Sequence, residues 1–110
     1  MTEPVELIEV IRLGDNELVA IWEAAEARTA LTLVAALPKG ELKRCFIPGW
    51  KILAHSATQF LFEISFCFRC DGALLRGPTV DPEQEIIHGF DSEDSTSREL
   101  LARLRAAAEA

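Results

Sequence analysis

The clearest pattern of hydrophobic and polar positions in the chain is an alternation that runs from residue 60 to residue 69. Large apolar side chains occupy every second position, and mostly polar side chains lie between them. Because a β-strand points successive side chains to opposite faces, this alternation predicts a strand with one aromatic face. That face consists of Phe60, Phe62, Ile64, Phe66 and Phe68. Fully burying each of these side chains would stabilise the fold by about 1.5–3 kcal/mol, so we expect the strand to be central.

The residues after this strand predict that the chain turns back on itself. Asp71 and Gly72 lie between two apolar runs, which is the strongest short signal of a two-residue hairpin turn. The turn predicts a partner strand at residues 73–76. Residues 85–90 fit either a brief edge strand or a segment that lies across the sheet.

Another strand is predicted at residues 50–56, before the aromatic strand. It follows Pro48 and Gly49, which match the two central positions of a type II turn. The length of the loop after this strand decides its register. With an even loop His55 shares the aromatic face, and with an odd loop Ala54 shares it instead.

The N-terminal part of the chain predicts a strand and then a helix. Residues 5–13 are rich in β-branched side chains, which favours a strand, and residues 14–16 interrupt it. Helical spacing then predicts a helix at residues 17–28, capped by the polar residues before it. The apolar positions of this helix are Leu18, Ile21, Trp22 and Ala25. Residues 31–37 fit either a continued helix or a strand, and Pro38 ends both.

The C-terminal part predicts a second helix at residues 95–108. Thr96 and Glu99 have the spacing of a capping box, and an apolar stripe follows them. Consecutive strands between two helices favour an α+β fold. We therefore expect one domain of 110 residues, with a mostly antiparallel sheet of four or five strands and helices 17–28 and 95–108 packed on it.

The chain has a net charge of −7, and its carboxylates are unevenly placed. One interval without any Lys or Arg contains Asp81, Glu83, Glu85, Asp91, Glu93 and Asp94. This interval fits a solvated loop and helix start, or alternatively a docking surface for a basic protein partner. The charge argues against nucleic acid as a partner, because phosphate binding needs a basic surface.

The composition predicts a folded protein of the cytoplasm. Apolar residues make up 49% of the chain and charged residues 26%, and no window approaches the roughly 18 apolar residues of a membrane span. Residues 1–4 lack the basic start and apolar core of a signal peptide. Three cysteines, an odd number, argue against a disulfide framework.

The cysteines support two main interpretations. Structural zinc needs four ligands, which Cys45, Cys67, Cys70 and a histidine (His88 or His55) would supply. Buried structural thiols are the other interpretation, since free cysteine is among the most buried residue types. An unbroken strand would put Cys67 and Cys70 on opposite faces, which opposes a shared site. Thiol–disulfide chemistry is also disfavoured, because the pair does not begin a helix that would lower the thiol pKa.

Three segments resemble parts of small uncharacterised bacterial proteins. They are Arg44-Cys45-Phe46-Ile47-Pro48, Cys67-Phe68-Arg69-Cys70 and His88-Gly89-Phe90-Asp91, the last ahead of a leucine-rich helix. Some of those proteins carry His where this chain has Phe46, so a metal site that used that His would lack a ligand here. The resemblance implies no activity.

The sequence favours a protein without catalytic activity. It contains no nucleophile elbow, no phosphate-binding glycine loop and no dinucleotide fingerprint. We expect an acidic protein-binding module, for example an inhibitor or immunity-type protein for a basic partner, that uses the acidic interval and needs no cofactor. The alternative is a small structural zinc-binding domain, and a third hypothesis is a thiol or carboxylate enzyme.

Overall fold

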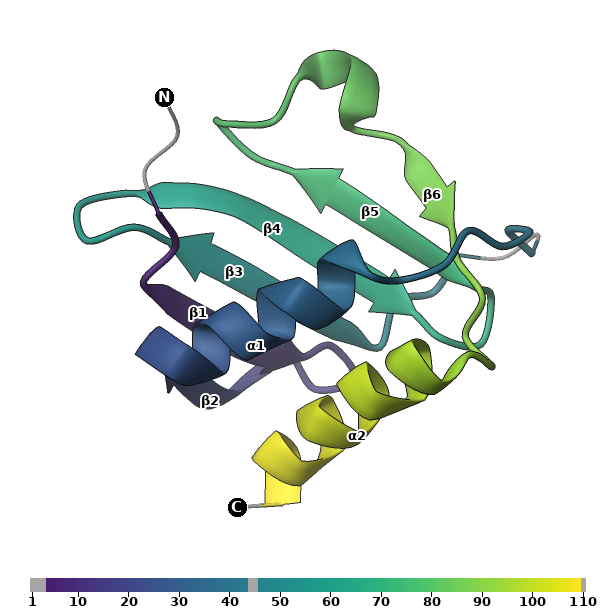
Figure 1. The fold of residues 1–110 in the computed structure, drawn as a ribbon, viewed down its shortest axis with the longest axis horizontal. Helices are drawn as coiled ribbons and strands as arrows, with labels where there is room; N and C mark the ends of the chain where they lie inside the picture. The colour runs from purple at the N-terminus through teal and green to yellow at the C-terminus, as the bar shows by residue number, and fades with distance from the viewer. Residues whose placement is uncertain (1–3, 44–45, 110) are drawn as a thin grey trace.

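The computed structural model describes residues 4–43 and 46–109. This part of the chain folds into a six-stranded antiparallel sheet and two α-helices, which confirms the α+β class (Figure 1). The strands are β1 (Leu7–Arg12), β2 (Glu17–Glu23), β3 (Trp50–His55), β4 (Phe60–Cys67), β5 (Gly72–Arg76) and β6 (Ile87–Gly89). The helices are α1 (Ala24–Ala35) and α2 (Ser95–Glu109), and a short 3-10 helix, η1, spans Pro82–Gln84.

The strand order is β2-β1-β3-β4-β5-β6, and α1 and α2 lie on the same face of this sheet (Figure 1). The core lies between that face and the helices, because alternate positions of each strand point toward them. Its fully buried members are Ile8, Val10, Ala27, Ile52, Ala54, Phe66, Leu100 and Leu104. No helix in the described ranges is long and apolar enough to cross a membrane.

The predicted helix at residues 17–28 is wrong, and its first part is the strand β2. Residues 13–16 form a turn in which Asn16 has φ 54°, so that β2 pairs antiparallel with β1. Pairing gives the β-branched and aromatic side chains of this segment a neighbouring strand to pack on, which outweighs its helical spacing. The extra strand is one reason why the sheet exceeds the predicted four to five strands. α1 begins directly after it at Ala24 and includes most of the ambiguous residues 31–37.

An exposed ion pair supports the turn between β1 and β2. The Arg12 guanidinium donates hydrogen bonds to the Asp15 carboxylate, with Nε–Oδ1 and Nη2–Oδ2 distances of 3.0 and 2.8 Å. This hydrogen bonding lowers the pKa of Asp15 below its usual range.

The aromatic strand β4 is central as predicted, between β3 and β5, but its alternation is interrupted once. Ala54 pairs with Phe62, whereas His55 pairs with Phe60, so Leu61 is an extra residue in β4. Such a bulge shifts the residues before it to the other face. Phe60 therefore leaves the core face and stacks beside His55, with ring centroids 5.6 Å apart. The register left open by the sequence is thus settled with Ala54 on the core face.

The hairpin between β4 and β5 turns at residues 68–71 rather than at Asp71 and Gly72. Cys67 pairs with Gly72, and Asp71 has φ 52°, a left-handed conformation that suits a turn. Gly72 already belongs to β5, and a Cβ atom there would lie 2.6 Å from Leu42 Cδ1. The glycine leaves room for this close packing rather than forming the turn, and a larger residue there would require the Leu42 side chain to move.

The predicted C-terminal helix is confirmed, although Thr96 does not cap it. Asp94 Oδ2 accepts a hydrogen bond from the Thr96 backbone N at 2.9 Å, and Ser97 Oγ donates to Asp91 O at 2.6 Å. The helix start is therefore fixed by the acidic residues before it. These contacts also fix where the acidic interval lies.

Candidate functional site: an apolar trough beside an acidic loop

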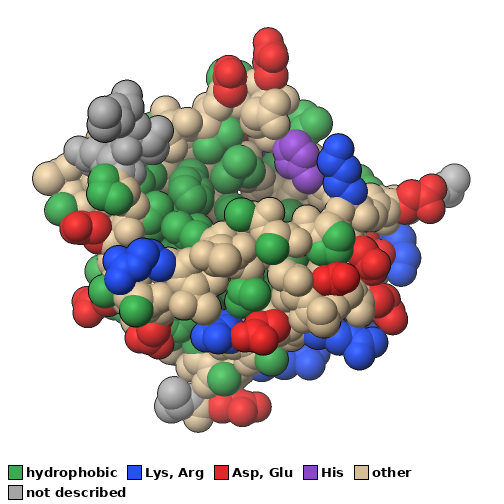
Figure 2. Space-filling view, viewed as in Figure 1, with side chains coloured by type: hydrophobic (Ala, Val, Ile, Leu, Met, Phe, Trp, Pro, Cys, Tyr) green, Lys and Arg blue, Asp and Glu red, His purple; other side chains and the backbone are tan. Residues whose placement is uncertain are grey.

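The helices leave part of the sheet open. α1 and α2 pack mainly against each other and against β1 and β2, at one side of the sheet. Over β4 and β5 lie neighbouring cavities of about 450 and about 470 Å³, and Val34, Ile64 and Leu75 line both. We call this continuous hollow the apolar trough. Figure 2 shows it as a depression lined by hydrophobic side chains.

The walls of the trough come from helix and sheet together. Its apolar lining consists of Leu31, Val34 and Leu37 from α1 and the residues after it, Phe62, Ile64 and Phe66 from β4, Ala73 and Leu75 from β5, and Phe90. The strand residues point into it because they belong to the core face of β4 and β5. Each cavity has the volume of a ligand-binding cleft, for which about 300–1,000 Å³ is typical.

The two cavities of the trough have different polar neighbours. Lys39 and His88 line one cavity, and Asp81 and Gln84 of the loop between β5 and β6 line the other. His88 Nε2 lies 3.1 Å from the Gln84 carbonyl oxygen, and no carboxylate in the described ranges forms an ion pair with Lys39. The trough is therefore lined mostly by apolar side chains, with Lys39 beside one cavity and Asp81 beside the other.

The acidic interval separates into two groups with different surroundings. Asp81, Glu83 and Glu85 lie on the loop beside the trough, around η1. The side chains of Asp81 and Glu83 are exposed and make no hydrogen bond or ion pair with any described residue. Glu85 differs, because its Oε2 accepts a hydrogen bond from the Gly77 backbone N at 3.0 Å.

The second acidic group, Asp91, Glu93 and Asp94, has contacts at the start of α2. Besides the Asp94 cap, Asp91 Oδ1 accepts a hydrogen bond from the Glu93 backbone N at 3.0 Å. Glu93 also forms an ion pair with Arg98 at 3.6 Å. Carboxylates at a helix N-terminus are favourable because they meet its unpaired N–H groups and its dipole. The predicted partner-binding residues thus do not form one continuous set, and only the first group borders the trough.

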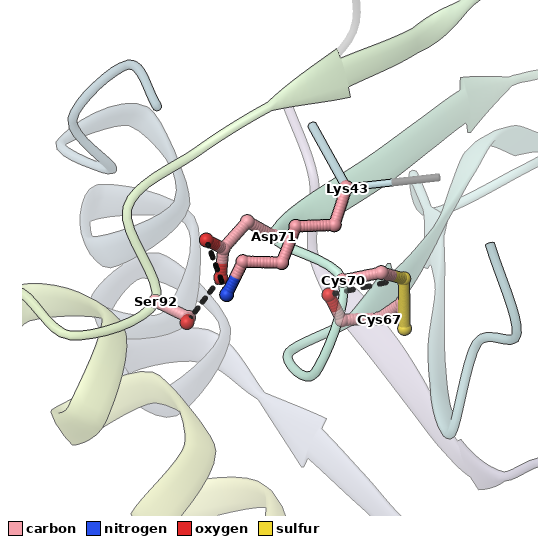
Figure 3. Close-up of a disulfide and its surroundings, with 5 residues drawn as sticks. All are labelled: Lys43, Cys67, Cys70, Asp71 and Ser92. Carbon is pink, nitrogen blue, oxygen red and sulfur yellow. Dashed lines mark hydrogen bonds and ion pairs between the residues drawn. A yellow bond between two sulfur atoms is a disulfide. The ribbon is translucent and has the colours of Figure 1, made fainter. Parts of the chain in front are cut away.

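Cys67 and Cys70 are joined by a disulfide, which the sequence interpretation did not expect (Figure 3). β4 ends at Cys67, so the strand geometry that would separate the two side chains does not extend to Cys70. The turn brings their Cα atoms to 5.4 Å, within the usual range for a disulfide. Both residues are buried.

The structure does not bring the other proposed zinc ligands to these sulfur atoms. His88 pairs with Ala73, whereas Cys67 pairs with Gly72, so His88 lies on the opposite face of the sheet. His55 lies 2.7 Å from Glu9, from Nε2 to Oε1, on the face away from the helices. Cys45 lies outside the described residues, and within those residues no cluster of three or more metal-ligating side chains occurs.

Sequence reasoning missed the trough, although α1 carried a signal of it. The buried residues of this helix are the small Ala27 and Ala30, and the larger Leu31 and Val34 lie one turn further on. The small residues occupy the fully buried positions of this helix. The large apolar residues beside them make its apolar stripe wider than its packing against the sheet and α2 requires. That excess indicates an apolar surface next to the helix.

The chain was compared with protein-family models, with curated proteins and with solved structures, and none of them matches it.

Proposed function

We propose that the protein is a non-enzymatic binding module that holds a segment of a basic protein partner in the apolar trough, beside the acidic loop. The proposal rests mainly on one observation: Asp81, an exposed carboxylate without a partner among the described residues, lines an apolar trough, and the exposed Glu83 lies two residues further along the same loop. A partner segment with apolar side chains and neighbouring Lys or Arg would satisfy both features. An inhibitor or immunity-type protein that blocks a basic partner is one form of this function.

The apolar side chains of the partner would supply most of the affinity. Leu31, Val34 and Leu75 are half-buried, so a bound apolar side chain would remove part of their surface from water. That burial contributes roughly 25 cal/mol per Å² before the cost of association is subtracted. Each cavity, at about 450 or 470 Å³, has the volume to receive anchoring side chains.

The charges would determine which partner binds and in which direction. Asp81 and Glu83 attract a basic segment to the acidic loop, while Lys39 repels it from the neighbouring cavity. The net charge of −7 adds a long-range attraction for basic proteins. Such charges act mainly on the rate of encounter and on specificity.

The test uses a fluorescently labelled amphipathic peptide made of Leu and Lys, and a matched peptide in which Glu replaces every Lys. Fluorescence anisotropy should show binding of the Lys peptide and much weaker binding of the Glu peptide. Val34→Asp places a charge in the trough and should abolish binding. Thr29→Asp adds the same charge to an exposed position of α1 outside the trough and should leave binding unchanged.

Equal binding of the Lys and Glu peptides would contradict the role of the acidic loop. Binding of the Lys peptide that is equally strong in the Val34→Asp and Thr29→Asp variants would contradict the role of the trough. Circular dichroism of each variant shows whether the fold is retained, so that lost binding is not confused with unfolding.

A further inference from the structure

The disulfide lies at the end of the β4–β5 hairpin, on the face of the sheet opposite the trough, and the turn that contains it is held by a separate set of contacts. The disulfide joins the last residue of β4 to the turn and encloses only Phe68 and Arg69. A disulfide restricts the unfolded chain less when the loop it closes is short. Stabilisation of the whole fold is therefore a weak explanation of why these two cysteines are joined.

The segment that ends at Lys43 contacts the turn that contains the disulfide. The Lys43 backbone N donates a hydrogen bond to the Cys70 carbonyl oxygen at 2.9 Å, and Lys43 Nζ lies 3.6 Å from Asp71 Oδ2. Figure 3 shows the Lys43 side chain extending toward Asp71, away from the sulfur atoms. The Lys43 side chain is 67% exposed, and exposed ion pairs contribute little stability. The ion pair between Lys43 and Asp71 is therefore a weak contact, although Cys67 and Cys70 are only 4% and 5% exposed.

The same turn also forms hydrogen bonds to the chain around Phe90, which lines the trough together with Lys39. The Asp71 carbonyl oxygen accepts a hydrogen bond from the Phe90 backbone N at 2.9 Å, and the Asp71 carboxylate accepts one from Ser92 Oγ. Phe90 in turn lines the trough and forms an isolated antiparallel β-bridge with Lys39. A change in the turn therefore reaches residues 38–43 and 89–92 through direct contacts.

We propose that Cys67 and Cys70 form a reversible redox site that is reduced in the folded protein by a dithiol, and that reduction loosens residues 38–43 and 89–92. A thiolate of the dithiol attacks one sulfur atom and forms a mixed disulfide, and the other cysteine leaves as a thiolate that takes up a proton. The second thiol of the dithiol, as its thiolate, then displaces the remaining cysteine, which is also protonated. The dithiol is oxidised to its disulfide, and two electrons and two protons pass to the cysteine pair.

The experiment uses the full chain with Cys45→Ser, which removes the remaining thiol. Protein purified without reductant is treated with dithiothreitol under native conditions, trapped with iodoacetamide and weighed by mass spectrometry. We expect two added alkyl groups while the circular dichroism spectrum stays that of the folded protein. Removing the dithiol and adding oxidised glutathione should restore the disulfide.

The contact from Lys43 is tested with a second variant and its matched control. Lys43→Ala should speed reduction about twofold to fivefold, which is the factor expected from losing an exposed ion pair. Arg28→Ala removes an exposed cation of α1 that has no ion pair among the described residues and lies outside the trough, and it should leave the rate unchanged. Hydrogen exchange at residues 38–43 and 89–92 should be faster in the reduced protein, whereas exchange in β1 should not change.

Three outcomes would overturn the proposal: reduction that occurs only in denaturant, protein that carries free thiols when purified without reductant, or hydrogen exchange that is the same in both redox states. None of these readouts involves a partner or a peptide. The redox proposal can therefore fail while peptide binding to the trough stands, and the reverse is equally true.

Discussion

His88 and Cys67 lie on opposite faces of the sheet, because their partners on β5, Ala73 and Gly72, are consecutive residues. A pleated strand points consecutive side chains to opposite sides, so a single metal ion cannot contact both. Because His88 borders the trough, the trough and the disulfide lie on opposite faces of the sheet. It also bears directly on the zinc hypothesis.

We expect untagged protein to carry well below one zinc ion per chain when measured by elemental analysis. His88 is directed away from the cysteines, and Cys67 and Cys70 are bonded to each other. Ethylenediaminetetraacetic acid should then leave the melting temperature unchanged. About one zinc per chain together with a strong loss of melting temperature in chelator would support the zinc-binding alternative, because structural zinc contributes directly to folding.

The aromatic strand predicts unequal effects of two similar substitutions. Phe66 is 0% exposed and contacts Phe90 edge-to-face, so Phe66→Ala should cost about 3–5 kcal/mol of unfolding free energy. Phe62 is only half-buried because it borders the trough, so Phe62→Ala should cost less, about 1–3 kcal/mol. Urea denaturation of both variants measures the difference. A larger loss for Phe62 would show that the trough is filled rather than open.

Local periodicity predicted some parts of the fold well because one face of each such segment is buried. β4 and α2 show this: Ile64 and Phe66 follow the alternation on the strand, and Leu100 and Leu104 follow the helical spacing. α2 was identified with nearly correct ends, and β4 with its correct start, although β4 ends at Cys67 and does not continue to Cys70. In such segments local preference and tertiary packing favour the same structure.

The errors occurred where long-range pairing decides the outcome. Residues 17–23 have helical spacing of apolar positions, but the adjacent β1 offers an antiparallel ladder along most of their length, interrupted by one bulge at Val19. The bulge at Leu61 and the four-residue turn before Gly72 depend on the register between strands, which no single segment contains. The trough could not be predicted for the same reason, since α1, β4 and β5 meet only in the folded chain.

The junction between β2 and α1 stores backbone strain that a substitution should relieve. Ala24 has φ 47°, a left-handed conformation that costs a non-glycine residue about 1–2 kcal/mol. Ala24→Gly should therefore raise the unfolding free energy by about 1 kcal/mol. Ala25→Gly, one residue further into α1, is the matched control and should lower it by about 0.5–1 kcal/mol. Thermal unfolding gives both signs, and a loss of stability in both variants would contradict the strained junction.

The two acidic groups should respond differently to neutralisation. Asp81→Asn with Glu83→Gln removes charges that have no partner among the described residues, so stability should stay within about 0.5 kcal/mol. The association rate of the Lys peptide should fall, and its dependence on salt should weaken, because exposed charges steer encounter. Asp94→Ala removes a backbone contact at the start of α2 and should cost about 1 kcal/mol of stability. Stopped-flow fluorescence at low and high salt measures the rates, and urea denaturation measures the stabilities. If the loop double variant bound the peptide as fast as the unmodified protein at low salt, the acidic loop would not be part of the binding surface.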